Sequence, residues 1–111
     1  MFEVAVGVTA IDTFYGGRER YTAAYLLHGS EPAIVETGPT TSVPHVVAGL
    51  ERLGVEPGDL AHIVLTHIHL DHGGGAGTLC ERFPNATVWV HELGARHLAK
   101  PDRLVASATM V

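Results

Sequence analysis

Apolar side chains occupy every second position at the start of the chain: Phe2, Val4, Val6 and Val8. This period of two predicts a half-buried strand over residues 2–9. Residues 21–28 and 32–36 are also rich in apolar side chains, and Gly29-Ser30 lies between them, which predicts a second pair of strands joined by a tight turn. The first third of the chain is therefore expected to form antiparallel strands.

The apolar spacing changes to a helical period after Ser42, which is a plausible N-cap. The helix is expected to end at Gly54, and one of its faces carries five apolar residues: Val43, Val46, Val47, Leu50 and Leu53. The apolar runs 63–65 and 86–90 predict two further strands, both buried. Helices are expected over residues 79–83 and 92–99.

Strands that alternate with helices after an antiparallel start predict an α/β domain with a mixed sheet. The 111 residues suit one domain rather than two. In such sheets the functional loops follow the carboxyl ends of strands.

Composition excludes several classes of partner. Lys and Arg number 7 against 12 Asp and Glu, which argues against nucleic acid and against an anionic membrane surface. There is no apolar run long enough to span a bilayer, and residues 1–13 lack the pattern of a signal peptide. Cys80 is the only cysteine, so a disulfide-stapled fold is not expected. These features predict a cytoplasmic protein.

The richest chemistry lies in the run Thr66-His67-Ile68-His69-Leu70-Asp71-His72-Gly73-Gly74. Imidazole and carboxylate groups are the ligands that Zn²⁺ and similar divalent ions take. In an extended backbone His67 and His69 point to the same side and can hold one ion, whereas Asp71 and His72 can reach a second. A water held between two such ions becomes a hydroxide nucleophile, which predicts metal-assisted hydrolysis. The alternative is a surface loop that is only histidine-rich.

This run resembles the signature of the metallo-β-lactamase-fold hydrolases. Residues 33–38, Ala-Ile-Val-Glu-Thr-Gly, resemble that family's strand ending in an acidic residue, although the family usually has Asp where this chain has Glu36. The resemblance implies that His67 and His69 bind the first metal and that Asp71 and His72 bind the second. It also implies that Asp71 orients the bridging hydroxide.

Glu36 is expected to accept a hydrogen bond from the ring nitrogen of a ligand histidine that faces away from the metal. The alternative role is an acidic cap where the strand meets its turn.

The resemblance covers essentially the whole chain but only about half of the family's αββα sandwich. The implied fold is the N-terminal half of that sandwich, with helices on one face of the sheet, and residues 1–111 are then a partial domain, a fragment that lacks the later metal ligands. Three residues after His72 remain as candidates: His91, which follows an apolar run, and His97 and Asp102, which are interpreted as solvated. One sheet face would be bare, which predicts self-association as a homodimer.

The resemblance implies a small-molecule substrate of the ester, thioester, lactone, lactam or phosphodiester class. Zinc is the expected metal, and iron or manganese is compatible with the same ligands. Two alternatives stay open: an iron-dependent oxidoreductase on the same fold, and a catalytically incomplete module that binds metal or self-associates.

The remaining polar and aromatic residues have plainer interpretations. Three histidines outside the run are interpreted as ordinary, partly exposed residues: His28, His45 and His62. Cys80 is expected to be a small core residue. Three aromatic residues flank a glycine-containing loop and either line a substrate pocket or pack against the sheet: Phe14, Tyr15 and Tyr21.

Overall fold

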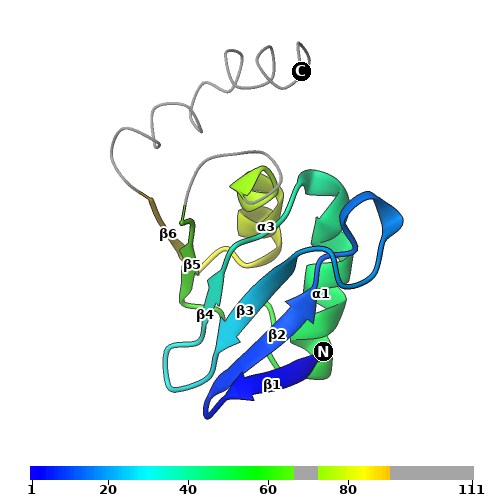
Figure 1. Ribbon diagram of the computed structural model, residues 1–111. Helices are drawn as coiled ribbons and strands as arrows, with labels where there is room; N and C mark the ends of the chain where they lie inside the picture. Colours follow the sequence, from blue (N-terminus) through cyan, green and yellow to red (C-terminus); the bar gives the residue numbers. More distant parts are fainter. Residues whose placement is uncertain (67–72, 91–111) are drawn as a thin grey trace.

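The computed structural model of the chain describes residues 1–66 and 73–90. Within them, six strands form one sheet in the order of the sequence (Figure 1). The strands are β1 (Phe2–Ala5), β2 (Val8–Asp12), β3 (Ala23–Leu27), β4 (Ala33–Val35), β5 (His62–Val64) and β6 (Thr87–Trp89). The α-helices are α1 (Val43–Arg52) and α3 (Ala76–Arg82), and two short 3₁₀ turns are η1 (Tyr15–Gly17) and η2 (Thr40–Ser42).

The sheet is mixed because its two halves are connected differently. The strands from β1 to β4 pair antiparallel with their neighbours, whereas β4, β5 and β6 pair parallel. Each parallel connection contains a helix, α1 after β4 and α3 after β5, and both helices lie on one face of the sheet (Figure 1). The predicted α/β fold with a mixed sheet and helices on one face is confirmed.

The first predicted strand is wrong in its extent. Residues 2–9 form two strands, β1 and the start of β2, which turn back on each other at Val6 and Gly7. Gly7 has φ +77, a conformation that glycine adopts without strain, and Val6 is 99% exposed at the tip of the turn. The alternating pattern simply continues through the hairpin, so it carried no sign of the reversal.

The core lies between the helices and the face of the sheet that they cover. The apolar face predicted for α1 is confirmed, because four of its residues are buried: Val43, Val46, Val47 and Leu50. They meet buried side chains from four neighbouring strands: Ile11, Leu26, Ile34 and Ile63. Ser42 is at the N-cap position as predicted, but its side chain makes no capping hydrogen bond.

The opposite face of the sheet is open in the described part of the chain. Its exposed apolar side chains come from three strands, β1, β3 and β6: Phe2, Tyr25, Leu27 and Trp89. The predicted full burial of residues 63–65 and 86–90 is therefore wrong on this side, where Val64 is half-buried and Trp89 is 54% exposed. Neither α1 nor α3 covers that face, so within residues 1–66 and 73–90 these side chains are shielded from water by their neighbours on the sheet and by neither helix.

None of the helices among residues 1–66 and 73–90 is long and apolar enough to cross a membrane.

Candidate metal centre

The predicted metal-binding run follows β5, at the edge of the sheet where the parallel strands end. Strands β4, β5 and β6 run in the same direction, so their carboxyl ends meet at this edge. Strand β2 is antiparallel to β3, which is antiparallel to β4, and it therefore ends at the same edge. The four predicted ligands, His67, His69, Asp71 and His72, lie outside the described residues. The structure describes both flanks of the run.

Glu36 joins the end of β4 to the residue that precedes the run. Its backbone N–H donates to the Val64 carbonyl at 2.9 Å. Its carboxylate Oε1 accepts a hydrogen bond from the Thr66 N–H at 2.8 Å and another from the Thr66 hydroxyl. Glu36 is only 6% exposed, so these hydrogen bonds are made in a poorly solvated place. Glu36 therefore fixes the backbone directly before His67, and its predicted bond to a ligand histidine stays a prediction.

The loop that begins at Glu36 also contacts the other flank of the run. The Gly75 N–H donates to the Gly38 carbonyl at 2.8 Å, and the Thr40 hydroxyl donates to the Gly74 carbonyl at 3.3 Å. A Cβ atom on Gly75 would lie 2.7 Å from Val43 Cγ2 and 3.0 Å from the Gly38 carbonyl oxygen. A glycine is thus needed at position 75, because a side chain there would collide with Val43 and with the backbone at Gly38.

These contacts bring the two ends of the run to one place. Residues 36–40 contact Thr66 before the run and Gly74 and Gly75 after it. The side chains between those flanks are donors suited to a divalent cation, three imidazoles and one carboxylate. Elsewhere in the described chain, no group of three or more His, Cys, Asp or Glu side chains could hold a metal ion. The candidate metal ligands therefore stay the four that the sequence predicts in the run.

Two of the three histidines that were interpreted as ordinary residues, His28 and His45, contact neighbouring side chains. His28 Nε2 lies 2.7 Å from the Thr9 hydroxyl, between adjacent strands. The His45 ring stacks on Phe14, with 4.6 Å between the ring centroids. Phe14 therefore packs against a helix residue rather than lining the open groove described below.

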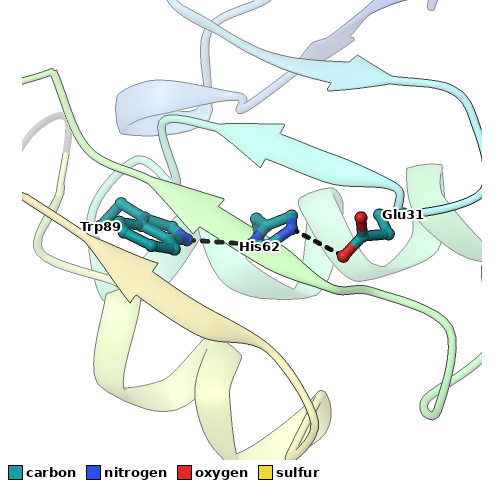
Figure 2. Close-up of polar contacts among 3 residues, drawn as sticks. All are labelled: Glu31, His62 and Trp89. Carbon is teal, nitrogen blue, oxygen red and sulfur yellow. Dashed lines mark hydrogen bonds and ion pairs between the residues drawn. The ribbon is translucent and has the colours of Figure 1, made fainter.

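The third histidine, His62, belongs to a polar chain along the open sheet face. Figure 2 shows Trp89, His62 and Glu31 in line, from β6 across β5 to the segment before β4. The Trp89 indole N–H donates to His62 Nδ1 at 2.9 Å, and His62 Nε2 lies 3.4 Å from Glu31 Oε1. Because an indole nitrogen can only donate, His62 Nδ1 must accept, and a neutral ring then carries its proton on Nε2. These partners give His62 a structural role.

Cys80 packs against the core from α3, as predicted. Burial raises the pKa of its thiol, because the charged thiolate loses solvation there. A raised pKa disfavours the nucleophilic form, so Cys80 is a packing residue.

A groove of about 960 Å³ reaches Thr66, the residue directly before His67 in the sequence. Glu36 and Thr66 line one part of it, and the side chains of Asp12, Arg20 and Tyr21 line another. Of the two interpretations left open for Tyr21, its position in this groove fits the one in which it lines a pocket. Asp12 and Arg20 were not singled out by the sequence pattern, although an aspartate at the last residue of a strand, before a glycine-containing loop, is a signal for a turn-stabilising carboxylate.

Solved structures share this fold. MEM-A1, a subclass B3 metallo-β-lactamase from a soil metagenome library, superposes with a TM-score of 0.76 at 24% identity over 87% of this chain and 34% of that chain. A metallo-β-lactamase mutant from Cronobacter sakazakii gives a TM-score of 0.76 at 26% identity over 89% of this chain and 37% of that chain.

A curated relative matches in sequence. The N-acyl homoserine lactonase AttM of Azorhizobium caulinodans is 41% identical over 56 residues, which cover 50% of this chain and 20% of AttM. The chain therefore spans about a fifth of this relative and about a third of the solved structures.

The family model of the metallo-beta-lactamase superfamily matches residues 17–110, which include β3, the acidic residue after β4 and the whole histidine run. The chain belongs to the metallo-beta-lactamase superfamily.

Proposed function

We propose that this chain supplies metal ligands to the active site of a metal-dependent hydrolase. The observation that carries the proposal is that one loop, residues 36–40, contacts both flanks of the run from His67 to His72. A segment that is held at both ends loses less conformational entropy on binding a cation than a segment with free ends does. In this arrangement His67 and His69 bind one ion, and Asp71 and His72 bind a second.

The donor set fits zinc, because imidazole nitrogen and carboxylate oxygen are common zinc ligands in catalytic sites. Manganese or iron fits the same donors less selectively. The chemistry that such ions supply is Lewis-acid activation of water and stabilisation of the oxyanion that develops on the substrate. The chain's own residues have two tasks: Glu36 and Thr66 fix the entry to the run, and Asp71 orients the attacking water.

A small carbonyl compound, a lactone or a related ester, is the substrate class that we favour. The curated relative AttM is an N-acyl homoserine lactonase by name, and the structural neighbours are β-lactamases. Both names denote hydrolysis at a cyclic carbonyl, which supports hydrolysis over the iron-dependent oxidation considered as an alternative.

Zinc uptake by the purified chain tests the proposal. We expect the chain to retain zinc after dialysis and the double variant His67→Ala, His69→Ala to lose it, because both imidazoles proposed for the first ion are gone. His28→Ala is the matched control, since His28 contacts Thr9 instead. Elemental analysis gives the number of ions per chain, and lactone hydrolysis with added zinc gives turnover. Equal zinc contents in the wild type and the double variant would contradict the proposed ligands.

We also propose that the isolated chain self-associates through its open sheet face. The observation that favours this is the row of exposed apolar side chains on that face: Phe2, Tyr25, Leu27 and Trp89. Apolar area of this kind is stabilised when it leaves water.

The mass of the chain in solution tests self-association. We expect light scattering to give the mass of a dimer at high protein concentration, and Tyr25→Glu to shift that mass to the monomer's 11.8 kDa. The reason is that a buried, unpaired carboxylate would oppose the contact. A monomeric wild type at all concentrations would contradict self-association without affecting the proposed metal site.

A further inference from the structure

Trp89, the only tryptophan of the chain, is fixed at two separate points. Its backbone is joined to β5, because the Leu65 N–H donates to the Trp89 carbonyl at 2.9 Å. Its side chain is joined to the same strand by the hydrogen bond from the indole N–H to His62 Nδ1 at 2.9 Å (Figure 2). An indole has one polar hydrogen, so this bond uses its whole capacity to donate. His62 therefore holds the ring of Trp89 while the backbone pairing holds the strand.

The hydrogen bond between Trp89 and His62 requires that Nδ1 carries no proton. In the neutral ring Nδ1 accepts from the indole and Nε2 carries the hydrogen. A second proton on the ring must go to Nδ1, where it would face the indole hydrogen across the same 2.9 Å. Nδ1 lies at the N–H edge of the indole, so the new charge is not over the ring face, where a cation is attracted. Protonation of His62 thus turns an attractive contact into a repulsive one.

The contact between His62 and Glu31 responds in the opposite sense. His62 Nε2 lies 3.4 Å from Glu31 Oε1, and a charged imidazole makes this contact an ion pair. The Glu31 side chain is 75% exposed, so the pair is weak, but it favours the charged form of the ring. Protonation therefore strengthens the contact with Glu31 while it breaks the contact with Trp89.

Glu31 is the charged group that faces His62 within residues 1–66 and 73–90. There, the polar and ring contacts of the His62 side chain go to Glu31 and Trp89. In the turn before β5, the Asp59 carboxylate instead accepts a hydrogen bond from the Glu56 N–H at 2.9 Å, and both residues are exposed. The neighbours of His62 on the same face of the sheet do not titrate: Ala33 on β4, Val64 on β5 and Thr87 on β6.

We propose that His62 is a pH-sensitive switch for Trp89: the neutral imidazole holds the indole against the sheet, and the imidazolium releases it to solvent. Histidine changes its charge between about pH 5 and 8, so the ring is held at the upper end of this range and released at the lower end. Release adds mobile apolar area to the open sheet face, on which Trp89 is already 54% exposed. The switch does not depend on the proposed hydrolase function, since it uses none of the predicted metal ligands.

The fluorescence of Trp89 tests the switch, because no other tryptophan contributes to it. For the metal-free chain, we expect the acrylamide quenching constant to rise about 1.5-fold from about pH 8 to about pH 5, as the ring is released. His62→Gln keeps an acceptor that does not titrate, so it should lack this transition. His28→Gln is the matched control and should keep it, because His28 contacts Thr9 instead. A wild type without the transition, or a His62→Gln variant that retains it, would overturn the proposal.

Glu31→Gln provides a second test that leaves His62 in place. Without the carboxylate charge the imidazolium is less stable, so the midpoint of the fluorescence transition should move to lower pH, by up to about 1 unit for an exposed pair. Glu51→Gln makes the same change at an exposed position of α1, on the other side of the sheet, and should leave the midpoint in place. A midpoint that Glu31→Gln leaves unchanged or raises would contradict the role of His62.

Discussion

Glu36→Gln is expected to lower the affinity of the chain for zinc about 10- to 100-fold, the range found when a residue that supports metal ligands is altered. Glutamine keeps an acceptor oxygen for Thr66, but the hydrogen bonds from the Thr66 N–H and hydroxyl become weaker because the acceptor is no longer charged. The change also removes a buried negative charge at the entry to a site proposed for cations. Competition with a zinc-binding dye measures the dissociation constant directly.

Glu56→Gln is the matched control for this variant. It makes the same chemical change at an exposed position in the turn after α1, so its zinc affinity should equal that of the wild type. Thermal unfolding of both metal-free variants separates a loss of affinity from a loss of folding. If Glu36→Gln binds zinc as tightly as Glu56→Gln, Glu36 has no part in supporting the ligands, and its contact with Thr66 only joins two strands.

The fold was predictable from the sequence where patterning and turn residues agreed. The helical spacing from Val43 to Leu53 and the turn at Gly29-Ser30 both matched the structure, because each pattern has one low-energy solution. The β1–β2 hairpin was missed because its alternation does not change phase at the turn. The exposure of Trp89 was missed because the sequence of an apolar strand does not indicate whether another layer of the structure covers each of its faces.

The candidate site also has a part that was predictable from the sequence and a part that was not. The histidine run and Glu36 were predictable, because their residue types carry the chemistry and their order resembles a known signature. The supporting contacts were not, since they use backbone groups whose partners lie far away in sequence, such as Asp12 with Arg20 and Glu36 with Thr66. The left-handed backbone of Phe14 and Arg20 was also hidden, because the usual sign of that conformation is glycine.

Glu36 has a left-handed backbone, with φ +72, and its contacts explain why this strained conformation is kept. Glu36 directly follows β4, and its N–H still pairs with the Val64 carbonyl of β5. Its side chain also contacts Thr66, which lies two residues after Val64 in the same polypeptide. The left-handed backbone at Glu36 accompanies both contacts, so the hydrogen bonds to Thr66 offset the cost of this conformation. The loop can then turn away toward Gly74 and Gly75.

Phe83→Ala should lower the free energy of unfolding by about 3–5 kcal/mol, the range for removing a buried phenylalanine. Phe83 follows α3, is 2% exposed and belongs to the core cluster between the helices and the sheet. The substitution leaves a cavity that the surrounding side chains fill only partly. Because domains of this size are stable by about 5–15 kcal/mol, the variant should lose a large share of its stability. Urea denaturation followed by circular dichroism measures the difference.

Phe2→Ala makes the same substitution on the open face of the sheet, where Phe2 is 68% exposed. If that face is in contact with water, the cost should be about 0.5 kcal/mol or less, as for other surface positions. A cost of several kcal/mol that grows with protein concentration would instead mean that a second copy covers the face, because association adds to stability by mass action. A cost for Phe83→Ala as small as the surface value would contradict the core described here. Both variants replace phenylalanine by alanine, so the difference between their free energies of unfolding shows which face of the sheet the helices of the chain cover.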